Sequence, residues 1–195
     1  MTALMTVVVI LLIVAAGAGF AFNGLVRRRN RTGEAWSQID VELKRRHDLI
    51  PNLVQTVKGY AAHESATFQA VTVSRASAIS AGATEDPVAV ASAENTLNSS
   101  LRSLFAVAEN YPALRAQEGF LALQGQLTSS EDKIEYARHY YNTSVRDYNT
   151  AMQTFPRTLI AGPLGFHSAV FFQTGDADRA TPLVDFTFPA VPSAG

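Results

Sequence analysis

The feature that most constrains this chain is an uncharged apolar run near its N-terminus, Ala3 to Phe22, which reads ALMTVVVILLIVAAGAGFAF. A helix of this length spans about 30 Å, which is the hydrocarbon thickness of a bilayer. A secretory signal peptide is the main alternative, but signal peptides carry basic residues before the apolar stretch, whereas here the basic residues follow it. We therefore expect an uncleaved membrane anchor over residues 1–24.

The anchor is followed within a few positions by four basic residues, namely Arg27, Arg28, Arg29 and Arg31. By the positive-inside rule they place the N-terminus outside and the rest of the chain in the cytoplasm, as a single-pass protein of the cell membrane. Each basic residue beside a bilayer attracts anionic headgroups by about 1 kcal/mol, so we expect the bilayer and its anionic headgroups as partners. The net charge of −1 shows no basic excess, and we expect no nucleic-acid partner.

Beyond the anchor, apolar residues recur at every third or fourth position, which is the spacing of amphipathic helices. Two such segments flank Pro51, a third begins after Asp86-Pro87, and the longest runs from Ala113 to Phe155. Asp86 suits a helix N-cap and Pro87 suits the first helical position. Amphipathic helices joined by short connections bury their apolar stripes against one another. We therefore expect an all-α fold, with an antiparallel bundle of long helices over residues 25–156.

The C-terminal region, residues 157–195, differs in composition from the bundle. It is rich in glycine and proline and contains several phenylalanines. The runs at 170–172 and 183–188 favour short strands or extended segments that lie on the bundle. We therefore divide the chain into an anchor (1–24), a bundle (25–156) and an aromatic, irregular or β-like tail (157–195).

One segment, LKRRHDLIPNLVQTVKGYAAHE at residues 43–64, concentrates side chains of the kind that active sites use. Pro51 has no N–H to donate to the carbonyl of His47, so a helix either kinks here or ends, with Asp48 capping the next helix. We expect a helix junction at Asp48 and Pro51. In either arrangement the helical spacing places His47 on the outer face.

Three charged residues occupy positions where the helical spacing requires an apolar side chain: Arg46, Glu64 and Glu94. A buried charge costs several kcal/mol unless it is paired. One interpretation is therefore that these residues meet opposite charges or polar partners across the bundle, such as Tyr148 or Asn149. The other is that they lie at the edge of the apolar stripe and reach solvent through their long stems. The sequence leaves both open.

The sequence contains no constellation that predicts catalysis or a metal centre. Cysteine is absent, which removes thiolate zinc sites and cysteine nucleophiles. Glu135 and His139 share a helix face, but two ligands do not complete a metal site. There is no glycine-rich phosphate loop and no Gly-x-Ser-x-Gly. We expect a protein that is not an enzyme and binds no cofactor. The alternative is an enzyme built on one charged cluster, namely Arg45, His47, Asp48, His63 and Glu64.

These motifs resemble the LemA family of bacterial membrane proteins. Residues 22–76 carry Ala-Trp-Ser and Arg-Arg-His-Asp-Leu-Ile-Pro-Asn-Leu-Val, and residues 109–156 carry two Tyr-Asn pairs seven positions apart. A weaker likeness extends into the tail. The resemblance implies one N-terminal membrane helix followed by a bundle of long helices, and it supplies no catalytic activity, cofactor or substrate. Some relatives belong to the magnetosome membrane, and others are encoded beside membrane peptidases.

The function that we expect is that of a membrane-anchored helical scaffold, which presents its bundle to protein partners or to further copies of itself as a homo-oligomer. The long apolar seam of residues 113–155 and the aromatic tail motivate this expectation, because both offer surface beyond one small core. The alternative from another class is an adaptor or regulatory subunit of a membrane protease or transport complex. Stoichiometric capture of such a complex distinguishes the two.

Overall fold

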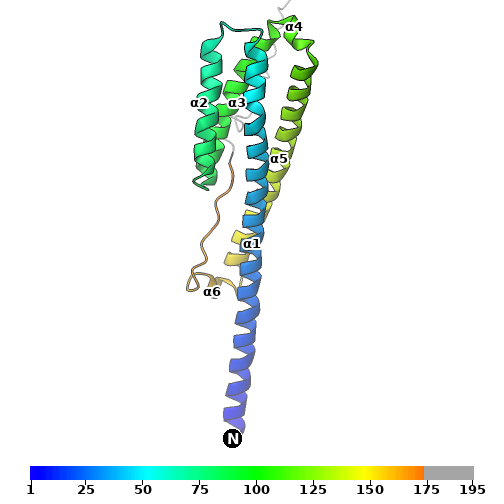
Figure 1. The fold of residues 1–195 in the computed structure, drawn as a ribbon. Coiled ribbons are helices and arrows are strands. Elements are labelled where there is room, and N and C mark those ends of the chain that lie inside the picture. The colour runs from blue at the N-terminus through cyan, green and yellow to red at the C-terminus, as the bar shows by residue number, and fades with distance from the viewer. Residues whose placement is uncertain (174–195) are drawn as a thin grey trace, which may run out of the picture.

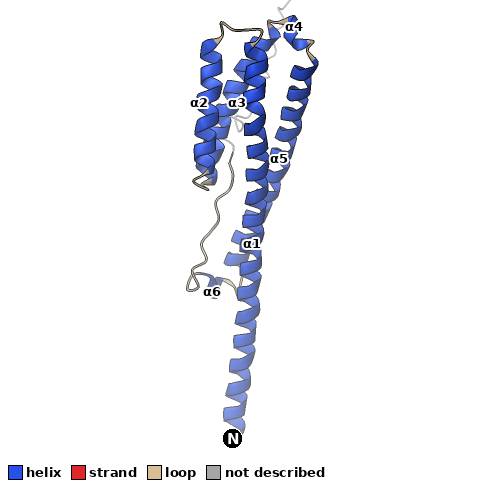
Figure 2. Ribbon diagram, in the orientation of Figure 1, coloured by secondary structure: helices blue, strands red, loops and turns tan. Residues whose placement is uncertain are grey.

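A computed structural model describes residues 1–173 of the chain. All regular structure in this range is helical, and it contains no strand (Figure 2), which confirms the predicted all-α fold. Val170–Phe172 is irregular, and the second predicted strand, at 183–188, lies outside the described residues. The helices are α1 (Thr2–Lys58), α2 (Ser65–Gly82), α3 (Pro87–Glu109), α4 (Pro112–Arg115), α5 (Glu118–Gln153) and α6 (Thr158–Ala161).

The four long helices alternate in direction and form an antiparallel bundle (Figure 1). α1 and α5 form the central pair, and the hairpin of α2 and α3 packs along the half of α1 that is farther from the N-terminus. The N-terminal part of α1 projects beyond the bundle, and residues 1–20 are exposed throughout. This part is long and apolar enough to cross a membrane, as expected for the anchor.

The core consists of three apolar clusters arranged along the bundle. The first lies farthest from the N-terminus and joins α1, α2, α3 and α5, the second joins α1, α3 and α5 midway, and the third lies where α1 leaves the bundle. Each cluster contains fully or almost fully buried residues. Examples are Leu53 and Leu97 in the first cluster, Ile39 and Val145 in the second, and Leu25 and Tyr148 in the third.

Of the two arrangements expected at Asp48 and Pro51, the junction between two helices is wrong, because α1 continues through Pro51 to Lys58. Pro51 removes the backbone donor of the His47 carbonyl, as the sequence indicates. The side chain of Arg75, on α2, replaces that donor, since its Nε donates to the His47 carbonyl oxygen over 2.7 Å. A contact from another helix therefore keeps the carbonyl of α1 satisfied.

Two other helix boundaries differ from the expected ones. The segment after Pro51 is interrupted by a turn at residues 59–64, so Glu64 lies at the N-cap position of α2 rather than on a helical stripe. The long helix expected from Ala113 begins only at α5, where the Gln117 side chain accepts a hydrogen bond of 2.9 Å from the Phe120 N–H. The predicted start of α3 is correct: Asp86 Oδ1 accepts from the Val88 N–H over 3.0 Å.

Candidate functional site

A layer of charged and polar side chains separates the first apolar cluster from the second. On α1 it lies between Leu43 and Ile50, which belong to different clusters, and on α5 between Leu127 and Ile134. Four helices contribute to it. We call this group the polar layer: Arg46 and His47 from α1, Arg75 from α2, Glu94 and Asn98 from α3, and Glu131 from α5.

Arg46 is the centre of the polar layer. Its side chain is almost completely buried, with the residue 2% exposed. The Nη2 atom forms an ion pair with the Glu94 carboxylate. The Nη1 atom lies 2.6 Å from Glu131 Oε2 and donates to Asn98 Oδ1 over 2.9 Å. Burial lowers the pKa of Arg46 and Glu131 raises it, but a guanidinium remains protonated in proteins. One cation therefore joins α1, α3 and α5.

His47 shares the buried carboxylate of Glu94 with Arg46. Its Nε2 atom lies 2.7 Å from Glu94 Oε1, and both residues are buried. Burial, followed by the charges of Arg46 and Arg75, lowers the pKa of His47 from 6.5 to about 4. His47 is therefore neutral at pH 7, and its Nε2–H donates to Glu94. The charges of the layer are then those of Arg46 and Arg75, which are positive, and of Glu94 and the half-exposed Glu131, which are negative.

The polar layer contains some of the residues singled out in the sequence and not others. Arg46 and Glu94 are buried and pair with each other. Glu64 is half-buried and makes no capping hydrogen bond through its side chain. Tyr148 and Asn149 lie near the other end of α5 and provide no hydrogen bond to Arg46, so they are not its partners.

Sequence reasoning missed His47, which is buried rather than on the outer face. The signal that locates the layer is that the seams of α1, α3 and α5 carry buried polar residues at Arg46, Glu94 and Ser130. In the antiparallel bundle these three positions fall at the same level. The hydroxyl of Ser130 is buried and makes no hydrogen bond within the described residues.

The structure does not assemble the charged cluster that the enzyme alternative requires. Arg45 and Asp48 are exposed on α1, whereas His47 points into the polar layer. His63 and Glu64 lie in the turn between α1 and α2. Within residues 1–173 no hydrogen bond or ion pair joins any two of these residues, and no group of three or more metal-ligating side chains comes together.

A second polar arrangement fixes the chain that follows α6. We call residues 166–173 the strap; the strap runs back along α5 in the opposite direction (Figure 1). Asn149 exchanges two hydrogen bonds with the backbone of Ala169, both 2.9 Å long. Asn142 makes the same pair with Phe172, at 3.0 and 2.9 Å. Each asparagine thereby substitutes for a neighbouring strand.

The spacing of the two Tyr-Asn pairs follows from the geometry of the strap. Seven helical residues rise about 10.5 Å, and three residues of extended chain span about 10 Å, so Asn142 and Asn149 match strap residues three apart. The Tyr141 hydroxyl donates to the Val170 carbonyl over 2.8 Å. Phe172 packs beside Trp36, with ring centroids 6.0 Å apart. Burial raises the pKa of Tyr141 and keeps its hydroxyl protonated.

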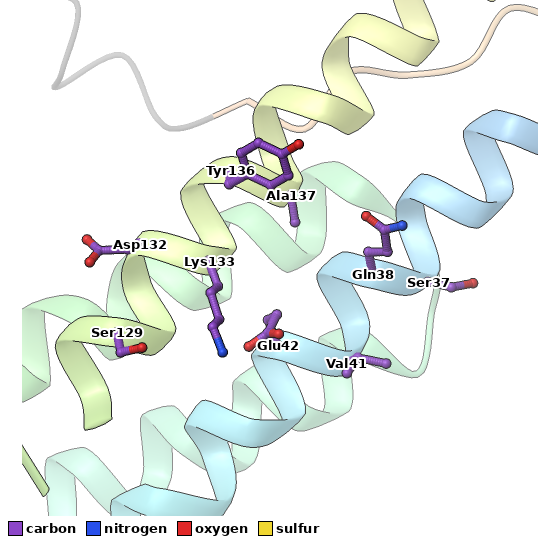
Figure 3. Close-up of a pocket in the computed structure, with 9 residues that line it drawn as sticks. All are labelled: Ser37, Gln38, Val41, Glu42, Ser129, Asp132, Lys133, Tyr136 and Ala137. Atoms are coloured by element: carbon purple, nitrogen blue, oxygen red, sulfur yellow. The ribbon is translucent and has the colours of Figure 1, made fainter. Parts of the chain in front are cut away.

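A groove of about 750 Å³ lies between α1 and α5 (Figure 3). Val41 and Tyr136 are 63% and 72% exposed, so the α2–α3 hairpin does not cover them. The groove combines apolar side chains with charges of both signs, which suits a peptide or helix rather than an ion. Its lining residues are Ser37, Gln38, Val41, Glu42, Ser129, Asp132, Lys133, Tyr136 and Ala137.

The predicted membrane-flanking arginines lie on α1 directly after its apolar part. Arg27, Arg29 and Arg31 are exposed, and Arg28 is half-buried. Arg29 also influences Tyr148: burial raises the pKa of this tyrosine and the arginine opposes the rise.

Comparison with known proteins places these features in a family. The LemA family model matches residues 35–186, a range that contains the polar layer and the strap. Protein LemA of Metamycoplasma hominis is 27% identical over 159 residues, which cover 80% of this chain and 71% of that protein. Magnetosome protein MamQ 2 of Paramagnetospirillum magneticum is 27% identical over 187 residues, covering 83% and 69%. Magnetosome protein MamQ of Magnetospirillum gryphiswaldense is 24% identical over 189 residues, covering 84% and 70%.

Proposed function

This chain belongs to the LemA family, and we propose that it is a membrane-anchored, non-enzymatic scaffold that holds a protein partner at a fixed position beside the bilayer. The observation that carries this proposal is the continuity of α1, a single helix of 57 residues. A helix of that length extends about 86 Å and passes from the exposed apolar run into the bundle core without a hinge. The bundle is therefore coupled rigidly to its anchor.

The proposal that no reaction occurs in the polar layer follows from its burial. Arg46 and Glu94 are 2% and 5% exposed, and the charges of this layer are engaged by one another. Pockets of about 270 Å³ beside Arg46 and about 360 Å³ beside His47 reach the edge of the layer, but Arg46 and Glu94 themselves stay almost fully covered. Buried, mutually paired charges are characteristic of structural networks that fix how helices meet.

We assign partner binding to the groove between α1 and α5. Interaction sites combine exposed apolar side chains with a polar rim. Val41 and Tyr136 supply the apolar part, and Glu42 and Lys133 supply charges of opposite sign (Figure 3). The groove is built from the same helix that forms the anchor, so a partner bound there is held at a defined distance from the bilayer.

The topology and the division of the chain are part of the proposal. The arginines after the apolar run support an N-terminus outside and a bundle in the cytoplasm. We keep the three regions at 1–24, 25–156 and 157–195, with the strap as the part of the third region that packs on the second.

Site-specific photo-crosslinking in cells tests the proposal. A photoreactive amino acid is placed at Tyr136 in the groove, and at Val73 on α2 as a control of similar exposure. We expect a discrete adduct from position 136 and none from position 73. The adduct is expected to disappear in a Val41→Asp background and to persist in an Ile79→Asp background, because only Val41 lines the groove.

The composition of the adduct separates the alternatives. An adduct of twice the chain's mass assigns the groove to self-association, and an adduct with a protease or transporter subunit assigns the chain to the adaptor class. Equal labelling from positions 136 and 73, or labelling that Val41→Asp leaves unchanged, contradicts a specific groove.

A further inference from the structure

We propose that the end of the bundle nearest the anchor makes a second contact with the membrane, by resting on the lipid interface. The contact surface is the base, which we define as residues 155–166. The proposal requires α1 to cross the bilayer, as in the proposed function, but it is independent of partner binding. Three observations support it: the level of the base along α1, the exposed apolar side chains of the base, and the arginines beside it.

The base lies at the level where the apolar run ends. The rings of Phe22 and Phe166 meet edge to face, with centroids 5.7 Å apart. A Cβ atom on Gly24 would lie 3.6 Å from Arg157 Nε. Ala161 and Phe166 belong to the same buried cluster as Leu25. Three contacts thus hold the base beside the segment 22–25 (Figure 1).

The membrane boundary on α1 then places the base in the headgroup region. The apolar run that fills the hydrocarbon ends at Phe22. Gly24 lies about 3 Å beyond it along the helix. The headgroup layer on each side of a bilayer is about 5 to 7 Å thick. Arg157, which abuts Gly24, is therefore within this layer, and so are the neighbouring residues of the base.

The base exposes large apolar side chains at this level. Phe155 is 75% exposed, Leu159 65% and Leu164 52%. They occur within ten consecutive positions, while Ala161 and Phe166 from the same segment are buried against α1 and α5. The base therefore has one face that packs on the bundle and another, apolar face that no other part of residues 1–173 covers. Because α1 crosses the bilayer beside the base, the lipid interface is the apolar environment adjacent to this exposed face.

The charges around the base match those of anionic headgroups. A groove of about 530 Å³ contains Gly24, Asn30 and Glu34 together with four arginines: Arg27, Arg28, Arg31 and Arg157. Three of these arginines come from α1, whereas Arg157 comes from the base. The base thus completes a cationic site that the sequence of α1 begins. Apolar side chains flanked by arginines are the pattern of interfacial membrane contacts.

Depth-dependent fluorescence quenching tests this contact. The chain has no cysteine, so Leu159→Cys and Leu164→Cys each provide one labelling site for an environment-sensitive fluorophore. Two reference sites are Ile10→Cys, within the apolar run, and Val73→Cys, an exposed position on α2. The full-length protein is reconstituted into vesicles of zwitterionic and anionic phospholipids that carry brominated acyl chains.

We expect labels at positions 159 and 164 to emit at shorter wavelength than the label at 73, and to be quenched by lipids brominated near the headgroup. The label at position 10 is quenched by lipids brominated near the chain end. If labels at 159 and 164 behave like the label at 73 while position 10 is quenched, the base does not touch lipid and the inference is wrong. If position 10 also escapes quenching, the anchor itself is wrong.

A third pattern assigns the base to a protein neighbour. A label at 159 that is blue-shifted but not quenched by any lipid is covered by protein, such as a second copy of the chain, and this overturns lipid contact.

The role of charge is tested separately. We expect stronger quenching at 159 with anionic than with zwitterionic lipid, and loss of this difference in Arg157→Gln but not in Arg45→Gln, an exposed arginine farther along α1. Equal quenching in both lipids contradicts the headgroup site.

Discussion

The polar layer and the strap both fix segments of the bundle, but they do so with different chemistry. In the polar layer, buried charges compensate one another across several helices, and Arg46 alone joins three of them. In the strap, uncharged amides of Asn142 and Asn149 satisfy backbone groups one residue at a time. The layer is therefore an interdependent unit, whereas each strap contact stands by itself. Substitutions should accordingly have large, coupled effects in the layer and small, local ones in the strap.

The largest effect is expected from Glu94→Ala, which leaves Nη2 of the buried Arg46 without its buried carboxylate partner. Breaking a buried ion pair from one side costs about 3–5 kcal/mol. Chemical denaturation of the full-length protein in detergent, followed by circular dichroism, measures the change. Glu131→Ala is the matched control and should lose far less, because the Glu131 side chain is 46% exposed. Equal losses for the two variants contradict the assigned centre of the layer.

A smaller loss of stability is expected at the His47 carbonyl, where the Arg75 side chain replaces the backbone donor that Pro51 lacks. The effects of substitutions at Arg75 and Pro51 should depend on each other. Arg75→Met leaves the His47 carbonyl without a donor and should lower the free energy of unfolding by about 1–3 kcal/mol. Pro51→Ala restores a backbone N–H at that position. In the Pro51→Ala background, Arg75→Met is expected to cost less than in the wild type. A double-mutant cycle with no coupling shows that the two donors do not serve the same carbonyl.

The strap should respond locally. Asn149→Ala removes two hydrogen bonds to Ala169, each contributing about 1 kcal/mol, and releases the strap while the helices remain packed. Amide hydrogen exchange at Ala169 is expected to accelerate, with α1 and α5 unchanged. Asn149→Asp retains the acceptor for the Ala169 N–H and should give intermediate exchange. Faster exchange throughout α5 contradicts the independence of the strap.

The last effect expected is a change in the pH dependence of stability. The folded-state pKa of His47 lies below 6.5, at about 4, so between these values the unfolded chain binds more protons than the folded one. The contribution of His47 is fully present above pH 6.5 and is lost as the pH falls toward 4. His47→Gln keeps a donor for Glu94 without the titration. The difference in stability between wild type and His47→Gln should therefore shrink as the pH falls, and a constant difference is the contrary result.

What the sequence predicted and what it missed have physical reasons. Helical spacing revealed the long helices and, through two polar residues on apolar seams, Arg46 and Glu94. It left the continuity of α1 at Pro51 open, because the donor that satisfies the His47 carbonyl is Arg75, 28 positions away in the chain. Local rules of helix formation contain no such information.

The strap is a second feature whose contacts the sequence pattern does not predict. The two Tyr-Asn pairs are visible in the sequence, and their seven-residue spacing returns both to one face of α5. Its partner is irregular chain, which has no periodicity that a sequence pattern reveals. The aromatic residues of the tail distinguish it in the sequence. Nothing in the sequence indicates that Asn142 and Asn149 bind the backbone of the tail.

The most direct test of the central claim, that the polar layer is structural and the groove functional, combines both regions in one protein. Arg46→Met, His47→Leu and Glu94→Leu together replace the two buried charges and the neutral imidazole with apolar groups of similar size. Such replacements are often neutral or stabilising. In this variant we predict that the photoreactive residue at Tyr136 yields the wild-type adduct in cells. A folded variant that has lost the adduct contradicts the account, because the charges themselves are then required for function.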